Sequence, residues 1–461
     1  MALWERAATP RHGAWLGFCF GLGLYSAGTW WLYISIRGFG QAPIAVALGV
    51  MGSLVLIMSA YQALLGYIAR RWLAPASAAG QMLWIPAAWV IVEWFRGWFM
   101  SGFPWLSLGY SQTETWLAGL APVGGVHLLS FALLMGAGAA LSLWRERGPS
   151  RALALVALVL PWTLGVSLQS VQWTHASGEA RSVAILQGAI PQDLKWLESN
   201  QQNILDTYAR LHRQALGAQL IVWPESALPQ VANAMTEYLG IVWSAADRAG
   251  SDVVMGVMRA EPQGNPATDP WFNSMLAFSK GQAVFYDKRH LVPFGEYFPV
   301  PAFVRSWLRL MNLPNADFEA GKRHQPPLSV AGVKLAPSIC YEDAYPALLR
   351  PETRAADALV TVTNDAWFGR SGARYQHLQI ARMRALESRR YMIRAANDGV
   401  SALIGPDGQV VAQAPEFKAS VLRGQFTPRQ GNTPYLLLGD ALALGVAALL
   451  LLVRIVSARL R

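Results

Sequence analysis

Cys340 is the side chain of this sequence that is best placed to act as a nucleophile. The 461 residues contain two cysteines, and Glu342 and Asp343 follow Cys340 within three positions. A thiol has an ordinary pKa of about 8.5, so a base or a cation must help it to form a thiolate at neutral pH. Cys340 therefore predicts nucleophilic chemistry if such groups lie close to it. The alternative is a small, buried apolar residue.

Glu225 and Lys288 are the charged residues that fit this requirement. Glu225, Lys288 and Cys340 each follow an apolar run of strand character, at residues 220–224, 283–287 and 335–339. Ligands of α/β sheets bind beyond the carboxyl ends of the strands, so the three side chains can converge. Glu225 could then accept the thiol proton, and Lys288 could stabilise a thiolate and an oxyanion. Each alone also fits a structural role, but their shared position favours a site.

His290 and the possibility of a metal give two alternatives to this arrangement. His290 lies two positions after Lys288 and is the second choice of base, in a Cys–His dyad. The histidines and cysteines do not form a ligand set typical of a metal site. We therefore expect no metal and no other cofactor.

The residues around these candidates predict an α/β domain, because strand-like and helix-like patterns alternate between residues 172 and 434. Strands are expected at residues 182–186, 220–223, 253–257, 334–339 and 359–363, with a β-rich stretch at 275–287 and a hairpin at 400–411. Helices are expected at residues 197–216, from the second strand to about residue 248, and at 375–395. Buried strands alternating with helices indicate a sheet covered by helices.

The remaining residues predict membrane-spanning helices. Only 14% of the chain is charged and 53% is hydrophobic, whereas soluble domains average about 25% charged residues. Six stretches reach the roughly 20 mostly apolar residues that a bilayer core needs, at residues 14–36, 43–68, 82–100, 117–144, 152–171 and 435–456. We therefore expect an α-helical membrane bundle at 1–171 (about five helices), the α/β domain at 172–434, and a last helix with a basic tail at 435–461.

The arginines predict the orientation of these helices, because cytoplasmic loops collect Lys and Arg. Basic residues gather at the N-terminus, in alternate short loops and after the last segment: Arg6, Arg11, Arg70, Arg71, Arg145, Arg147, Arg151, Arg454, Arg459 and Arg461. Both termini are therefore expected in the cytoplasm and the large domain outside. The net charge of +10 then needs no nucleic-acid partner.

Glu93 and Arg96 lie in the third of these segments, three positions apart and so on one helical face. Ionisable residues inside a span are costly and indicate a function by default. The alternative is a pair that satisfies itself near the helix end. Cys19 lies in an apolar, glycine-rich stretch, and we interpret it as a packing residue.

Several motifs resemble known families. Residues 223–227 (WPESA), 286–296 (YDKRHLVPFGE), 338–342 (SICYE) and 364–369 (NDAWFG) together resemble the carbon–nitrogen hydrolase (nitrilase) superfamily. Residues 17–21 (GFCFG), 93–97 (EWFRG) and 102–105 (GFPW) are similar to its membrane-integrated branch, the apolipoprotein N-acyltransferases. The resemblance covers nearly the whole chain. The family generally has eight membrane helices, so we expect an N-terminal pair to be missing, either because Met1 is an internal start or because this lineage is shorter.

The resemblance implies a nitrilase-like αββα sandwich inserted before the last transmembrane helix. It implies a triad of Glu225, Lys288 and Cys340 with Glu296 and Glu342 as supporting carboxylates. The implied substrate contacts are Trp196, Asn273, Tyr341 and Trp367.

The reaction that the resemblance implies is ping-pong acyl transfer. Cys340 would take an acyl chain from a phospholipid, typically phosphatidylethanolamine, as a thioester. The amine of the diacylglyceryl-cysteine at a lipoprotein's N-terminus would then receive it. This implies a bacterial cytoplasmic (inner) membrane, with the catalytic domain on the periplasmic side.

Residues 303–313 (FVRSWLRLMNL) predict an arm that dips into the membrane interface, because bulky apolar residues alternate with Arg305 and Arg309. The alternative is an amphipathic helix packed on its own domain. Two other functions stay open: a membrane-tethered amidase of the nitrilase type with water as acceptor, and a non-catalytic scaffold for lipid or lipoprotein sorting.

Overall fold

The computed structural model describes residues 1–263, 269–297 and 318–460, and these form two compact units. The helical unit comprises Met1–Trp173, Phe368–Arg389 and Asn432–Arg461, and the α/β unit comprises Thr174–Trp367 and Arg390–Gly431. An α-helical bundle with an α/β domain is the fold class that the sequence predicts, and it is confirmed. The predicted arm at residues 303–313 lies outside the described residues.

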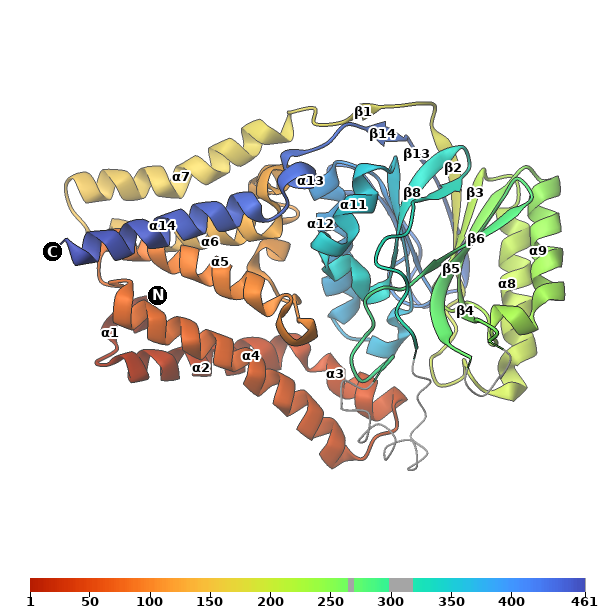
Figure 1. Ribbon diagram of the computed structural model, residues 1–461, viewed down its shortest axis with the longest axis horizontal. Helices are drawn as coiled ribbons and strands as arrows, with labels where there is room; N and C mark the ends of the chain where they lie inside the picture. The colour runs from red at the N-terminus through yellow and green to blue at the C-terminus, as the bar shows by residue number, and fades with distance from the viewer. Residues whose placement is uncertain (264–268, 298–317, 461) are drawn as a thin grey trace. The chain divides into compact units, whose positions relative to one another are not determined.

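The α/β unit contains two six-stranded sheets (Figure 1). The first has the order β13-β2-β3-β4-β5-β6: Ser420–Phe426, Arg181–Gln187, Leu220–Trp223, Asp252–Ala260, Trp271–Ser279 and Gln282–Asp287. The second has the order β12-β11-β10-β9-β8-β7: Val410–Gln413, Ala402–Ile404, Met392–Ala396, Ala358–Thr363, Val333–Ile339 and Leu328–Val330. A short ladder pairs β1 (His175–Ala176) with β14 (Arg429–Gln430).

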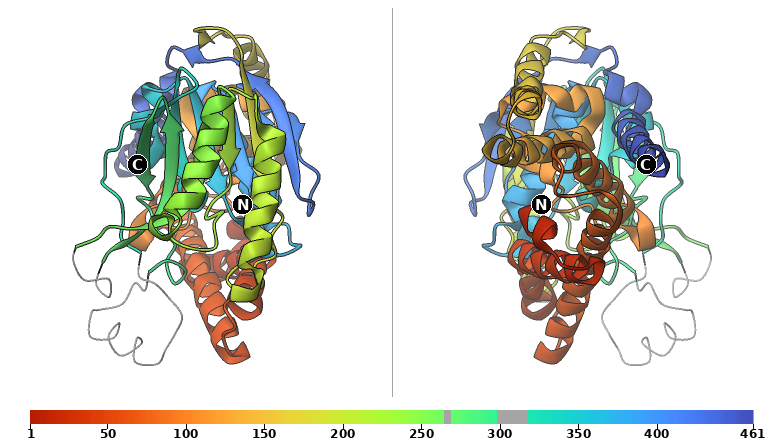
Figure 2. Two further views of the ribbon diagram at one scale, coloured as in Figure 1. Left: turned by 90° about the vertical axis from the view of Figure 1, so that its right-hand side faces the viewer. Right: turned by 90° about the vertical axis from the view of Figure 1, so that its left-hand side faces the viewer.

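Alternation along the strands builds two apolar layers, because successive side chains of a strand point to opposite faces. Ile185 and Val222 of the first sheet pack against Leu335 and Val360 of the second, which makes the core between the sheets. The opposite face of the first sheet packs against two helices, α8 (Gln201–Ala215) and α9 (Thr236–Arg248). Figure 2 shows both helices crossing the outer face of this sheet. The second sheet contacts α11 (Pro346–Arg354).

Strand directions bring the predicted site residues to one edge of each sheet. In the first sheet β3 is parallel to β4, and β5 is antiparallel to both β4 and β6, so β3 and β6 run the same way. In the second sheet β8 is parallel to β9, which is parallel to β10. Glu225 and Lys288 therefore leave their sheet at the same edge.

The hairpin predicted at residues 400–411 is confirmed by β11 and β12, but the long helix predicted at 375–395 is wrong in its last turns. The helix α12 (Ala373–Ser388) ends at Arg389, which adopts a left-handed backbone with φ of +51°. The strand β10 follows, and it pairs in parallel with β9. The buried strand β10 is stabilised by this pairing, which local helix propensity cannot anticipate. β13 was also not predicted.

Four helical stretches of the described residues are long and apolar enough to cross a membrane. They are α4 (Ile44–Trp72), η5 (Trp116–Leu120) continued by α6 (Ala121–Arg145), α7 (Pro149–Gln169) and α14 (Ala441–Arg459). The other two stretches predicted as spans contain α2 (Pro10–Thr29) and α5 (Ile85–Arg96). Shorter helices are α1 (Ala2–Arg6), α3 (Trp31–Tyr33) and α13 (Pro434–Leu438).

Glycines let α2 and α4 pack backbone to backbone. Gly13, Gly17 and Gly21 recur every four residues on α2 and are buried. A Cβ added at Gly17 would lie 2.1 Å from the carbonyl oxygen of Gln62 on α4. Small residues at this spacing allow the close approach on which helix association in lipid depends.

Glu93 and Arg96 do not form the pair that the sequence suggests as one alternative. Glu93 Oε1 accepts a hydrogen bond from the backbone N–H of Leu108 at 2.9 Å. Arg96 donates to the carbonyl oxygen of Trp105 at 2.7 Å and to Ser107 Oγ at 3.2 Å. Both side chains therefore hold the segment that follows α5, which contains the GFPW motif.

Candidate active site

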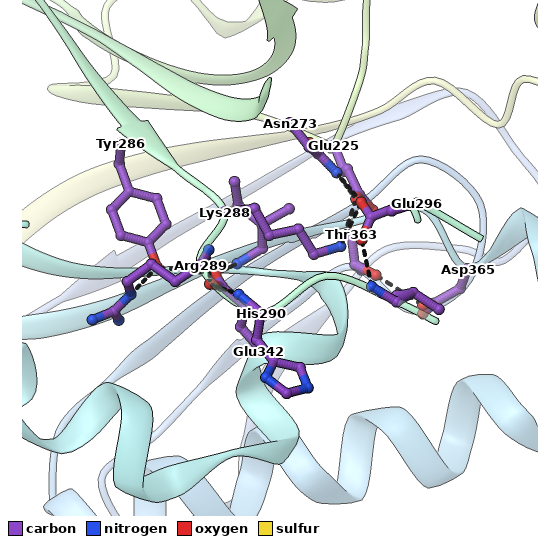
Figure 3. Close-up of polar contacts among 12 residues, drawn as sticks. Glu225, Asn273, Tyr286, Lys288, Arg289, His290, Glu296, Glu342, Thr363 and Asp365 are labelled. Atoms are coloured by element: carbon purple, nitrogen blue, oxygen red, sulfur yellow. Dashed lines mark hydrogen bonds and ion pairs between the residues drawn. The ribbon is translucent and has the colours of Figure 1, made fainter. Parts of the chain in front are cut away.

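Glu225, Lys288 and Glu296 meet at the edge of the first sheet (Figure 3). Lys288 Nζ lies 2.9 Å from Glu296 Oε1 and 3.6 Å from Glu225 Oε1. Lys288 is only 1% exposed and Glu225 only 7%. A buried ammonium between two carboxylates stays protonated, because their charges raise the pKa of Lys288 despite its desolvation. The lysine is therefore a fixed positive charge and not a proton acceptor.

Asn273, on β5, holds the two glutamates in place. Its Nδ2 atom donates to Glu225 Oε1 at 2.7 Å and to Glu296 Oε1 at 2.8 Å. Glu296 Oε2 also accepts the backbone N–H of Val292 at 2.8 Å. These bonds orient Glu225 without adding a charge. They give Asn273 a positioning role, and its role as a substrate contact stays a prediction.

Cys340 lies where β8 ends and the 3₁₀ turn η8 (Cys340–Ala344) begins. Its φ of +50° is left-handed, a backbone region that non-glycine residues seldom adopt and that recurs at functional sites. Burial and the negative charge of Glu225 raise the pKa of the Cys340 thiol. The positive charge of Lys288 lowers this pKa, but by less than those two effects raise it. The resting group is therefore a thiol, so its proton must move when the sulfur attacks.

Glu342 ties the turn of Cys340 to the segment after Lys288. Its carboxylate accepts hydrogen bonds from four donors: the N–H of Ile339 (2.8 Å), the N–H of Arg289 (2.7 Å), the N–H of His290 (3.3 Å) and the Tyr286 hydroxyl (3.0 Å). Burial raises the pKa of Glu342 although these bonds oppose the shift. Its place between backbone donors of both segments fits a supporting role.

His290 lies beside two tyrosine rings, and the choice of Glu225 over His290 as the base stays a prediction. The imidazole ring of His290 lies 3.8 Å from the ring of Tyr345 and 5.9 Å from that of Tyr341, measured between centroids. Its backbone N–H donates to Glu342. Glu225, in contrast, is close enough to Cys340 for its charge to raise the pKa of the thiol.

Two family models match most of the chain. Residues 182–431 match the Carbon-nitrogen hydrolase family, and residues 1–139 match the Apolipoprotein N-acyltransferase N-terminal domain. The chain is 42% identical over 452 residues to the apolipoprotein N-acyltransferase of Azotobacter vinelandii, covering 97% of this chain and 87% of that protein. The chain belongs to the apolipoprotein N-acyltransferase family. It is also 41% identical over 460 residues to the apolipoprotein N-acyltransferase of Chromobacterium violaceum, covering 98% of this chain and 87% of that protein.

Among solved structures, the C. elegans NitFhit protein is similar over 62% of this chain and 65% of its own, with 19% identity and a TM-score of 0.42. The family membership confirms the resemblance seen in the motifs. The family membership and the apolar helices together indicate a protein of the inner membrane.

Three further residues that the family resemblance points to lie outside this charged cluster. Trp196 is 46% exposed and Trp367 is 40% exposed. Tyr341 is partly buried, and its ring lies 5.1 Å from that of Tyr345. Their substrate contacts stay predictions. Within the described ranges, no group of three or more His, Cys, Asp or Glu side chains is arranged to hold a metal ion.

Lys195 is a buried charge near the site that the sequence analysis missed. It is 2% exposed, and its Nζ lies 3.5 Å from the backbone oxygen of Glu225 and 5.3 Å from the ring centroid of Trp196. Burial lowers the pKa of Lys195 to about 8, although the charge of Glu225 opposes the shift. The only sequence signal was its place directly before Trp196.

Proposed function

We propose that the protein transfers a fatty acyl chain from a phospholipid, through a thioester on Cys340, to the N-terminal amine of diacylglyceryl-cysteine in apolipoproteins. Phosphatidylethanolamine is the proposed donor. The observation that carries the proposal is the buried Glu225–Lys288 pair, whose charges act on the Cys340 sulfur. Membership of the apolipoprotein N-acyltransferase family supports the choice of substrates.

The first half-reaction forms the thioester. Glu225 takes the thiol proton as the sulfur of Cys340 attacks the ester carbonyl of the phospholipid. The S–C bond forms, the ester C–O bond breaks, and Glu225 returns the proton to the oxygen of the departing lysophospholipid. Lys288 stabilises the negative charge that the carbonyl oxygen carries in between. Because Asn273 and Glu296 fix both groups, little reorganisation accompanies the attack.

The second half-reaction moves the acyl chain to the lipoprotein. The neutral α-amine attacks the thioester carbonyl, the N–C bond forms and the C–S bond breaks. Glu225 accepts the proton that the amine loses and returns it to the sulfur of Cys340. The thiol is restored, so no cofactor is consumed.

The membrane is needed because moving the acyl chain from lipid into water costs a large free energy. At roughly 0.8 kcal/mol per methylene, moving a chain of about fifteen methylenes from lipid to water costs roughly 12 kcal/mol. A site for this reaction must therefore open to the bilayer. We place the catalytic domain on the periplasmic side of a multi-pass protein with both termini in the cytoplasm, as the arginine-rich loops predict. The domain boundaries at residues 171 and 434 stay predictions.

Labelled phospholipid and an amine-bearing lipopeptide test the proposal. The transferase yields labelled N-acyl lipopeptide and lysophospholipid, and Cys340→Ser abolishes both products. Free fatty acid as the sole labelled product would instead establish an amidase-like hydrolase with water as acceptor. Full activity of Cys340→Ser in cells would establish a non-catalytic scaffold.

A further inference from the structure

A buried triad of charged residues lies in the α/β unit, on the segments that follow β8 and β9 and on β10. Arg394 Nη2 donates to Asp365 Oδ2 at 2.7 Å, and Arg394 Nη1 lies 3.5 Å from Asp343 Oδ2. Asp343 and Arg394 are 0% exposed and Asp365 is 1% exposed. Three charges removed from water in this way are costly, and they persist only where their geometry is well satisfied. The proposed reaction assigns them no step.

The strand register places this triad beside the nucleophile. Ile339 of β8 pairs with Val362 of β9, so the next residues, Cys340 and Thr363, leave neighbouring parallel strands together. Asp365 follows Thr363 by two positions. A Cβ at Gly399 would lie 2.8 Å from Asp365 Oδ2, and Gly399 has a φ of +138°. The backbone therefore approaches Asp365 as closely as only glycine permits.

Thr363 connects the triad to the sulfur. Thr363 Oγ1 donates a hydrogen bond to Asp365 Oδ1 at 3.0 Å (Figure 3). A hydrogen bond between Thr363 and Cys340 lowers the pKa of the thiol, whereas the charge of Asp365 raises it. A hydroxyl group carries one hydrogen and two lone pairs, so it can accept from a thiol or donate to a thiolate.

We propose that the Thr363 hydroxyl is the hydrogen-bond partner of the Cys340 sulfur during catalysis, and that Asp365, held by Arg394 and Asp343, positions this hydroxyl. In the resting state the thiol donates to Thr363 Oγ1, which donates to Asp365. When Glu225 removes the thiol proton, the Thr363 hydrogen turns from Asp365 to the anionic sulfur. Arg394 compensates the charge of Asp365 in both states, so the Asp365 carboxylate keeps a charged partner when the Thr363 hydrogen reorients.

The inference deepens the proposed function, because it rests on Cys340 as the nucleophile. It predicts that two substitutions shift the pKa of the Cys340 thiol in opposite directions. Removing the hydroxyl withdraws a donor from the thiolate, so the pKa of the thiol rises in Thr363→Val. Neutralising Asp365 removes a negative charge that raises the pKa of the thiol, while Arg394 keeps its contact with Asp343, so the pKa falls in Asp365→Asn. Each shift should be on the order of one pH unit.

Alkylation of Cys340 by iodoacetamide measures this pKa without any turnover. The full-length protein in detergent micelles, with Cys19→Ala as the background, is reacted between pH 6 and pH 11, and the Cys340 peptide is quantified by mass spectrometry. The charges that act on the pKa of the sulfur include those of Glu225 after β3, Lys288 after β6 and Asp365 after β9. Glu342 and Asp343 lie on its own turn. All except the substituted group stay unchanged in every variant.

Thr361→Val is the matched control, because Thr361 is a buried threonine two positions earlier on β9 and so on the same face of the strand. Within the described residues its hydroxyl has no hydrogen-bond partner. We expect Thr361→Val and Thr363→Ser to titrate like the unsubstituted protein. Should Thr363→Val fail to fold, Thr363→Ala tests the same claim, because it also removes the hydroxyl.

An unchanged profile in Thr363→Val would overturn the inference. So would a shift of the same sign in Thr363→Val and Asp365→Asn, or an equal shift in Thr361→Val. Because alkylation needs no substrate, these outcomes do not depend on the acyl-transfer test. In that test, activity of Cys340→Ser would refute the proposed function itself.

Discussion

Replacing Lys195 with methionine should stabilise the protein at neutral pH. Lys195 is 2% exposed, and its pKa falls from 10.5 to about 8 on folding. Below pH 8 the lysine is protonated in both the folded and the unfolded state, so the folded state carries the full cost of burying the charge. At about 1.36 kcal/mol per pH unit this cost is about 3 kcal/mol. Lys195→Met removes it, so the free energy of unfolding rises by about that amount at pH 7.

The pH dependence separates this electrostatic cost from better packing. Between pH 8 and pH 10.5 the folded lysine is neutral while the unfolded lysine is still charged, so the cost fades as the pH rises. The advantage of Lys195→Met over the unsubstituted protein should fall to about 1 kcal/mol at pH 9.5. In Lys195→Arg the cost of the buried charge should persist as the pH rises, because arginine stays protonated. This variant should lose stability relative to the unsubstituted protein as the pH rises.

Thermal unfolding in detergent, followed by tryptophan fluorescence from pH 7 to pH 10, measures these differences. Titration of other groups cancels when variants are compared at the same pH. The exposed Lys280 is the control, and Lys280→Met should give a difference that is small at every pH. A stability gain of Lys195→Met that does not change between pH 7 and pH 9.5 would refute the reasoning.

Three further predictions follow from the packing and the charges. Glu225→Gln should slow thioester formation at least 100-fold, because general-base catalysis contributes roughly 10²–10⁴-fold, while the melting temperature stays within a few degrees. Unchanged kinetics in a single-turnover assay would remove Glu225 as the base. Glu296→Gln should lower the pKa of Lys288, because it removes the nearer carboxylate. In a pH–rate profile of thioester formation, this variant should therefore lose activity at a lower alkaline pH than the unsubstituted protein does. Gly17→Val should separate α2 from α4 and lower the melting temperature markedly, whereas Gly23→Val, where an added Cβ has nothing within 4 Å, should not; equal losses in both would refute the packing argument.

Much of the site could be predicted because strand direction alone brings distant residues together. The runs before Glu225, Lys288 and Cys340 are apolar and short, which is typical of buried strands. They form β3, β6 and β8. The sequence could not show that Asn273 bridges Glu225 and Glu296, because that contact depends on the pairing of β5 with β4 and β6.

The features that sequence reasoning missed depend on tertiary contacts. Arg394 lies in a stretch predicted as helix, and its buried place beside Asp365 follows from the pairing of β10 with β9. The separate contacts of Glu93 and Arg96 with the segment after α5 likewise could not be read from their helical spacing. Lys195 has no pattern of its own, because its burial is set by the residues packed around it.

The thioester on Cys340 is the central claim, and intact-mass measurement tests it most directly. The purified protein is incubated with phosphatidylethanolamine of one defined acyl chain, without an acceptor. We predict a mass increase of one acyl group, located on the Cys340 peptide, absent in Cys340→Ser and discharged by an amine-bearing lipopeptide. N-acyl lipopeptide formed at the full rate by a protein that never carries an acyl group on Cys340 would contradict the account.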